Sequence, residues 1–509
     1  MKILLVYPRY PDTFWGFRTV LKFVKAKASQ PPLGLLIVAS IIRLFHSDWE
    51  IRLVDENVSP LTEKDLPWAD IVMISAMAIQ SKRAQEIIDL AKQFEKIVVA
   101  GGPVFTASYD GFTGVDYFVL NDAEITLKLF FEDWDKNNTK HIYTSEIRVD
   151  LDYSPLPMWS LISFSDYAAI GVQYSSGCPY DCDYCDITVL YGRKPRTKSP
   201  KRLINEIQSL YDAGYRHGPI FFVDDNIVGN KPRLKLALPE VIKWQRSHKY
   251  PYTITFQASV DLADHPDLLE LMSQANMCSA FIGFETTHLP SLESCNKKQN
   301  KRDLEKVAFI LQQHGIQPMG AIMVGFDPDP KEIFDQLINF LQKTGIPNAM
   351  VSLLDAMRGT KFYQRLKAED RLLSESQGDN TGGFLNFRPK MPIPDLLKGY
   401  QHILSTIYSP YKYYRRVSRM ITNIRPTVKS KLTRNKFQAF LKSIWYVGIT
   451  SRFWFWYWLL LIRTLIIKVR VLPLAVEYSI YWLHFKEVTR NTCKRIQQSL
   501  DGIEAKSIS

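Results

Sequence analysis

The sequence predicts an α/β fold in three parts, and three features of the chain carry that prediction. In residues 1–135 short apolar runs alternate with helical stretches, which is typical of a doubly wound parallel sheet with helices on both faces. After a linker at 136–165, the same alternation fills residues 166–385 with six strand–helix units and favours a partial (β/α)6 barrel. Residues 386–509 are basic, aromatic and mainly helical.

Each predicted strand is a short apolar run that ends in turn-forming residues. In the first part we expect strands at 2–7, 50–54, 71–75, 97–100 and 117–120, with helices at 34–45 and 81–94. In the second part we expect strands at 169–174, 219–223, 252–257, 280–284, 319–324 and 349–354, with helices at 201–213, 232–245, 266–275, 301–314 and 330–343.

Cysteine use and charge narrow the class of protein. Only six cysteines occur among 509 residues, and three of them lie close together, which indicates one thiolate site in a reducing compartment rather than a disulfide framework. The apolar start of the chain is too short for a signal peptide, so we expect a cytoplasmic protein. The net charge of +12 arises near the C-terminus, where every charged residue between positions 396 and 476 is Lys or Arg.

The aromatic and basic segment 410–485 allows two interpretations. Residues 453–462 form an uncharged run rich in Trp and Phe, which is too short to span a bilayer and is followed by Arg463, Lys468 and Arg470. Trp and Tyr beside Lys and Arg suit a peripheral contact with the inner face of a membrane. The alternative is a hydrophobic helix that packs onto the preceding domain with a solvated basic face. No motif for nucleic-acid binding is present, so no nucleic-acid partner is expected.

The strongest chemical signal is the spacing C-x3-C-x2-C formed by Cys178, Cys182 and Cys185. A short loop can place three thiolates against one iron–sulfur cluster, and three ligands leave one of four irons open to chelate another molecule. Cys278 and Cys295 have no spacing that would make either a fourth ligand. Zinc is the alternative metal, although structural zinc sites usually contain a second Cys pair that this chain lacks.

This motif, with Tyr184 before its third cysteine and a predicted barrel strand before its first, resembles the radical SAM superfamily. The resemblance implies a [4Fe-4S] cluster whose open iron binds S-adenosylmethionine, with an electron donor such as flavodoxin or ferredoxin. One electron then cleaves the sulfonium to give a 5′-deoxyadenosyl radical, whose chemistry the protein directs. By position, Tyr184 would contact adenine.

Three further strand ends match the family's binding segments by position. Asp224 and Asp225 stand where the family binds the methionine ammonium group, although the glycine-rich form of that segment is absent. Glu285 resembles the ribose-binding position, with an acid at a helix N-terminus as the alternative. Gly325 closes a segment that resembles the strand along adenine.

A doubly wound domain before a radical SAM barrel resembles the cobalamin-dependent class, in which the first domain holds the corrin ring. Ligands of such sheets bind at the carboxyl ends of the strands, although small residues there can also be ordinary turns. The common D-x-H-x-x-G motif is absent and His46 is the domain's only histidine, so we do not expect histidine to ligate cobalt. The remaining alternative is a scaffold without ligand. The residues expected around the ring are Asp55, Ser75, Met77, Gly101, Gly102 and Glu124.

Several short segments together resemble a subgroup with an added C-terminal domain, to which the hopanoid C-2 methylases belong. The subgroup implies methyl transfer from methylcobalamin to an unactivated carbon, here of a small-molecule or lipid-like substrate. The alternatives are a non-methylating enzyme such as a cyclase, a tRNA methylthiotransferase, which would need a second cluster, and a non-catalytic cobalamin or metal sensor. The segments are 31–34 (PPLG), 54–57 (VDEN), 101–103 (GGP), 185–187 (CDI), 192–198 (GRKPRTK) and 222–226 (FVDDN).

Overall fold

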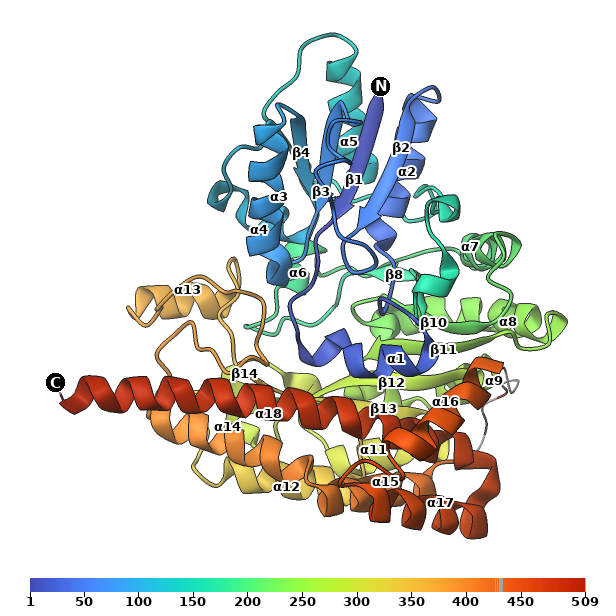
Figure 1. The fold of residues 1–509 in the computed structure, drawn as a ribbon, viewed down its shortest axis with the longest axis vertical. Helices are drawn as coiled ribbons and strands as arrows, with labels where there is room; N and C mark the ends of the chain where they lie inside the picture. The colour runs from blue at the N-terminus through green and yellow to red at the C-terminus, as the bar shows by residue number, and fades with distance from the viewer. Residues whose placement is uncertain (426, 428, 430–433, 509) are drawn as a thin grey trace.

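Three structural layers follow one another along the chain in the computed structural model, which describes residues 1–425, 427, 429 and 434–508. Figure 1 shows the N-terminal sheet at the top, the barrel strands in the middle and the C-terminal helices at the bottom. The predicted fold class is confirmed: two six-stranded parallel sheets are followed by a helical region.

The first sheet is parallel throughout, with the order β2-β1-β3-β4-β5-β6. Its inner strands are almost continuously apolar because helices cover both faces. Ile3 and Leu5 pack in the core that contains α2 and α5, whereas Leu4 and Val6 pack in the core that contains α3. The strands are β1 (Lys2–Tyr7), β2 (Glu50–Asp55), β3 (Ile71–Ser75), β4 (Ile97–Gly101), β5 (Tyr117–Val119) and β6 (Ile142–Tyr143), and the helices are α2 (Leu33–Phe45), α3 (Ser81–Gln93), α4 (Pro103–Ser108) and α5 (Ala123–Trp134).

The predicted linker 136–165 needs one correction. Strand β6 lies inside it and pairs with β5, so the sheet continues to Tyr143. A strand of two residues carries no periodicity that a sequence pattern could reveal. The rest of the segment contains only short 3-10 turns between residues 159 and 166.

The second sheet is an open barrel with the order β14-β13-β12-β11-β10-β7, and every neighbouring pair is parallel. Alternate residues of β11 are buried and partly accessible, because one side of the strand packs on helices and the other faces the lumen. The strands are β7 (Ile170–Val172), β10 (Gly218–Phe222), β11 (Tyr252–Ala258), β12 (Met277–Glu285), β13 (Gln317–Val324) and β14 (Ala349–Leu353), and the helices are α7 (Pro200–Asp212), α8 (Lys231–Ser247), α9 (Pro266–Gln274), α10 (Leu289–Ser294), α11 (Leu304–Gln313), α12 (Ile333–Thr344) and α13 (Lys361–Ala368).

Five C-terminal helices complete the fold, and α18 runs along the lower edge of the barrel in Figure 1. Helix α14 packs between α12 and α18, and α15 packs against α12 and α17. No helix in the described part of the chain is long and apolar enough to cross a membrane. The helices are α14 (Ile393–Ile407), α15 (Pro410–Asn423), α16 (Arg434–Tyr446), α17 (Trp454–Lys468) and α18 (Leu472–Ile508).

A segment near the N-terminus reaches across to the last helix. It contains α1 (Arg18–Val24), which contacts both α16 and α18. The Phe14 ring stacks on Phe485 with 5.0 Å between ring centroids, and the Thr19 hydroxyl donates to Glu487 at 2.6 Å. Residues of this segment and of α18 both line the space inside the barrel, so the two ends of the chain jointly form one wall of it.

Candidate active site

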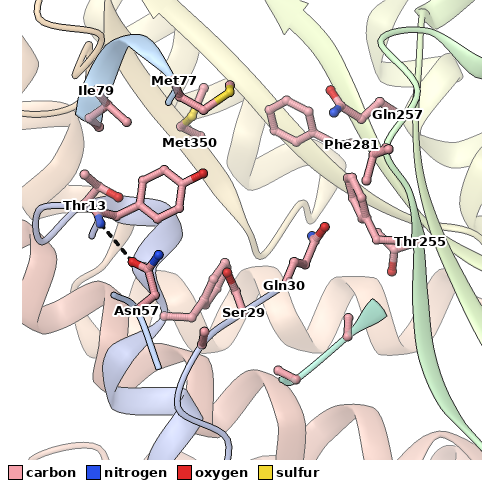
Figure 2. A pocket seen from close by; sticks show the side chains of 18 of the residues that line it. Thr13, Ser29, Gln30, Asn57, Met77, Ile79, Thr255, Gln257, Phe281 and Met350 are labelled. Atoms are coloured by element: carbon pink, nitrogen blue, oxygen red, sulfur yellow. Dashed lines mark hydrogen bonds between the residues drawn. The ribbon is translucent and has the colours of Figure 1, made fainter. Parts of the chain in front are cut away.

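A cavity of about 2790 Å³ lies between the carboxyl edge of the first sheet and the lumen of the barrel. Figure 2 shows Asn57 and Met77 from the first domain on one side and Gln257 and Phe281 from the barrel on the other. The carboxyl ends of two parallel sheets therefore open into the same space. Ligands of such sheets bind at these ends, so the cavity is the candidate active site.

The loop that carries the three cysteines enters this region directly after β7. It is framed by a two-stranded ribbon of β8 (Ser175–Ser176) and β9 (Arg196–Thr197). Gly177 has a φ of +89°, and a Cβ there would lie 2.9 Å from the Gly192 carbonyl oxygen, so the turn requires glycine. The amide of Cys178 donates to that same carbonyl at 3.2 Å. The loop then ends in the short helix α6 (Ile187–Leu190).

Two side-chain amides point at the cysteine sulfurs. Asn226 Nδ2 donates to Cys178 Sγ at 3.7 Å, and Gln299 Nε2 donates to Cys182 Sγ at 3.5 Å. Burial raises the pKa values of Cys178 and Cys185, so the free thiols are protonated until a metal displaces the protons. Three thiols on one loop with amide donors to their sulfurs fit an iron–sulfur cluster. Within the described ranges no three His, Cys, Asp or Glu side chains are grouped so that they could hold one metal ion.

Asp224 and Asp225, the two predicted aspartates, differ in their hydrogen-bond partners and in their access to the cavity. Asp224 is fully buried and accepts hydrogen bonds from the backbone amides of Tyr174 and Ser175, so it braces the chain before the cysteine loop. Asp225 accepts from the Gly177 amide at 2.9 Å and also lines the cavity. Burial raises the pKa of Asp224 to about 7 and that of Asp225 to about 6. Of the two, Asp225 is the carboxylate that a ligand in the cavity can reach.

Glu285 is buried with a partner that sequence reasoning missed. Lys297 Nζ donates to Glu285 Oε1 at 2.7 Å and lies 5.8 Å from the centre of the Tyr184 ring. Burial would lower the pKa of Lys297, but the charge of Glu285 raises it above its ordinary value, so Lys297 is a cation. A cation beside three cysteines suits a site that holds a negatively charged cluster and a carboxylate. No local motif marks Lys297 or Gln299, because only the tertiary fold brings them to the loop.

Tyr184 lies in a small apolar cluster at the ends of β13 and β14, with Phe326 edge-on at 6.1 Å. The Tyr184 hydroxyl is buried and has no hydrogen-bond partner among the described residues. Gly325 has a φ of +104°, and its amide donates to Asp329 at 2.9 Å. An apolar cluster that contains an unpaired hydroxyl suits an aromatic base with polar edges, such as adenine.

A second cavity of about 240 Å³ opens beneath the loops that follow β3, β4 and β5. Ser75, Gly101, Gly102 and Glu124 line it, and Ser75 also lines the large cavity. A Cβ at Gly102 would lie 2.5 Å from Ser75 Oγ, so glycine keeps the two loops close together. Arg196 lines the same slot, and its buried Nε has no hydrogen-bond partner among the described residues. A slot that adjoins the large cavity and contains one unpaired guanidinium N–H fits a polar side arm of a larger ring.

Of the remaining predicted residues in the first domain, some line the large cavity and others lie away from it. Met77 is exposed to the large cavity. Asp55 is buried behind the cavity wall, where it accepts from Asn57 Nδ2 at 2.7 Å and from the Tyr167 hydroxyl at 3.1 Å. It thus positions Asn57, which does line the cavity. His46 stacks on Trp49 at the end of α2, just before β2 begins, which is the opposite edge of the sheet from the cavity.

Comparisons with known proteins agree with this geometry. The B12 binding domain family matches residues 21–130, the Radical SAM superfamily matches residues 172–341, and DUF4070, a domain of unknown function, matches residues 360–498. Radical SAM methyltransferase TsrM from Kitasatospora setae, solved with cobalamin and a [4Fe-4S] cluster, has the same fold (TM-score 0.63, 14% identity, 94% of this chain and 98% of that chain). The cobalamin-dependent radical enzyme OxsB is equally similar (TM-score 0.62, 13% identity, 100% of this chain and 81% of that chain).

These domains and this site define a cobalamin-dependent radical SAM enzyme whose cofactors are a [4Fe-4S] cluster, S-adenosylmethionine and cobalamin. The chain belongs to the methyltransferase family that includes the hopanoid C-2 methylase of Rhodopseudomonas palustris, with which it is 32% identical over 88% of this chain and 86% of the relative. An uncharacterized methyltransferase of Synechocystis sp. is 39% identical over 82% of this chain and 78% of the relative.

The cysteine assignment is tested by replacing Cys182 with Ala. We expect the variant to lose the iron and the visible absorption of the anaerobically reconstituted protein, because two thiolates cannot hold a four-iron cluster stably. Cys493→Ala is the matched control, since Cys493 lies on α18 far along the chain from the loop. Iron content is measured against protein concentration. Full iron in Cys182→Ala would show that the ligand set is wrong.

Proposed function

We propose that the protein methylates an unactivated carbon of a lipid-like substrate of the hopanoid type. The observation that supports this most directly is the large cavity, which extends from the edge of the B12 binding domain to Ser176 and Asp186 on either side of the cysteine loop. When bound, the three cofactors supply hydrogen abstraction and a transferable methyl group. A lipid-like body would suit the lumen, where Phe221, Phe281, Met319 and Met350 line the wall.

The residues of the site divide the remaining work. We assign Asp225 to the ammonium group of S-adenosylmethionine and Lys297 to its carboxylate, since opposite charges pair strongly away from water. Tyr184 would hold adenine within its apolar cluster. The N-terminal segment and α18 form a wall of the cavity and so exclude water from a radical reaction.

An exposed apolar surface on the C-terminal helices also favours a lipid-like substrate. The side of α17 formed by Tyr457, Leu460, Leu461 and Thr464 is buried, whereas its opposite side is exposed and almost entirely apolar. Monomeric soluble proteins rarely expose such a face. The exposed apolar residues of α16, α17 and their connection, here called the docking face, are Phe437, Leu441, Trp445, Tyr446, Ile449, Trp454, Phe455, Trp458, Ile462, Leu465, Ile466, Ile467 and Val469.

We propose that the docking face inserts into the surface of an anionic membrane. Arg452, Arg463 and Arg470 are exposed among its apolar residues, and no acidic residue occurs between positions 396 and 476. Trp and Tyr next to such cations are typical of the bilayer interface. In Figure 1, α16 and α17 lie together at one lower corner of the molecule, so one surface could approach the bilayer.

The reaction is tested with anaerobic holoenzyme, S-adenosylmethionine, a chemical reductant and a bacterial lipid extract. We expect 5′-deoxyadenosine and a lipid that has gained the mass of one methylene group, both detected by mass spectrometry. A product that lacks this gain in mass would indicate cyclisation or rearrangement in place of methyl transfer. Intact S-adenosylmethionine in the presence of extract would contradict the proposed reaction altogether.

The role of Asp225 predicts a pH-dependent affinity for S-adenosylmethionine. The ammonium group binds the ionised carboxylate, whose pKa burial raises to about 6, so affinity should rise as the pH passes upward through about 6. Asp225→Asn should bind about tenfold more weakly above pH 6 and lose this pH dependence, because a charged hydrogen bond is worth about 1.5–3 kcal/mol. Equilibrium dialysis with labelled S-adenosylmethionine measures both effects.

Asp267→Asn is the control for that experiment, because Asp267 pairs with Lys235 on the surface of the barrel. It should leave the affinity and its pH dependence unchanged. If Asp225→Asn binds S-adenosylmethionine as the unchanged protein does, the ammonium group is held elsewhere.

Membrane docking is tested by vesicle co-sedimentation of the full chain. We expect binding to vesicles of phosphatidylglycerol and phosphatidylcholine, and a loss of at least about tenfold in Ile462→Glu/Ile466→Glu, since burial of one Ile side chain contributes about 1.5–3 kcal/mol. Leu236→Glu is the control, because Leu236 is equally exposed but lies on α8. Wild-type protein that stays in the supernatant would contradict the docking face.

A further inference from the structure

The large cavity has a second polar end, at the amino ends of the barrel strands. Gln317 is the first residue of β13, and Asn348 precedes β14 directly. Lys436 of α16 and Glu477 of α18 face the same space from the C-terminal domain. These four residues, here called the polar floor, lie across the lumen from the cysteine loop and take no part in the roles assigned above.

Glu477 brings a hydrogen-bond acceptor to the cavity, and Asn348, which also lines it, holds a buried amide oxygen without a partner among the described residues. Glu477 is exposed, but the surface that it exposes borders the cavity, and enclosure by the protein raises its pKa. Tyr481 donates a hydrogen bond to it, and the positive charge of Lys436 favours its ionised form. The Asn348 side chain is only 6% exposed, and its Oδ1 has no hydrogen-bond partner among the described residues.

The other two polar floor residues already have partners. The Tyr478 hydroxyl donates to Gln317 Oε1 at 2.8 Å. The Lys436 side chain also interacts with a neighbouring group, so it is not free for a ligand. A buried acceptor left without a donor costs about 1–3 kcal/mol, so Asn348 Oδ1 gains most from a molecule that brings a donor. Donors such as a hydroxyl or an ammonium group suit both Asn348 and Glu477.

The wall between the two polar ends is mainly apolar and has a definite length. Phe221, Phe281, Met319 and Met350 line it. Strand β11 runs along it for 7 residues, which corresponds to about 23 Å. A molecule that touches the polar floor and also reaches the carboxyl edge must therefore be elongated, with an apolar body.

We propose that the substrate is an elongated amphiphile whose hydroxyl- or amine-bearing end binds Glu477 and Asn348, so that its far apolar end reaches the reacting groups. The proposal rests on the proposed function and names the class of its substrate. It also gives a route from the docking face, because Phe437 belongs to that face and lines the cavity next to Lys436. The polar end stays nearest the membrane surface while the apolar body is shielded inside the lumen.

The test compares 1-dodecanol with its methyl ether, 1-methoxydodecane, which lacks the hydroxyl donor and carries one more methyl group. Equilibrium dialysis of the anaerobic holoenzyme should show dodecanol bound about tenfold more tightly than the ether, because a hydrogen bond to a charged acceptor is worth about 1.5–3 kcal/mol. Glu477→Leu should abolish that preference. Asn348→Leu, which changes a residue of the barrel instead of one on α18, should reduce the preference for dodecanol severalfold.

Glu487→Leu is the matched control, since Glu487 lies further along α18 and outside the cavity, where it accepts from Thr19. It should keep the wild-type preference for dodecanol. Equal affinities for alcohol and ether in the wild type, or an unchanged preference in Glu477→Leu, would overturn the proposal. Probe binding needs no turnover, so this result is independent of whether 5′-deoxyadenosine and a methylated lipid are formed.

Discussion

The structure depends on two sheet edges being held face to face, and the Arg196–Asp122 ion pair is one of the interactions that join them, beside the Tyr167–Asp55 hydrogen bond. Arg196 lies on β9 beside the cysteine loop, and its NH1 contacts Asp122 Oδ2 of the first domain at 2.8 Å. Both side chains are largely buried, so removing one partner would leave an uncompensated charge at a cost of about 3–5 kcal/mol. The exposed Arg358–Asp110 pair also joins the two domains, but such surface pairs contribute at most about 1 kcal/mol.

The two edges meet in a space that no single domain encloses. The open barrel supplies one wall, the first sheet supplies a second, and the N-terminal segment with α18 supplies a third. His484 bonds to the Phe14 carbonyl oxygen at 2.8 Å, and the Phe14 ring stacks on Phe485, so the third wall is held by contacts between the two ends of the chain. The helical C-terminal domain therefore supplies part of the wall of the candidate active site.

Most of the fold was predictable because its longer strands are apolar runs of a few residues bounded by turn-forming residues. All eleven strands expected from such runs are present, with ends shifted by up to three residues. The two-residue strands β6, β8 and β9 have no such signal. The three-cysteine loop could be proposed as a ligand set because the cysteines are close in sequence. Lys297, Gln299 and Glu477 could not be predicted, because their neighbours come from distant segments. The different surroundings of Asp224 and Asp225 likewise depend on backbone amides that only the fold reveals.

The two sequence interpretations of the aromatic, basic segment turn out to be compatible, since α17 packs on α15 through one side and exposes an apolar face on the other. Its basic residues are not equivalent, however. Arg416 is fully buried between Tyr408 and Tyr413, and burial lowers its pKa, so it belongs to the core and offers nothing to a membrane. An exposed Arg near an anionic surface contributes about 1 kcal/mol, whereas each inserted Trp or Ile contributes about 1.5–3 kcal/mol. In the proposed docking, apolar burial therefore supplies most of the affinity, and the cations select the anionic surface.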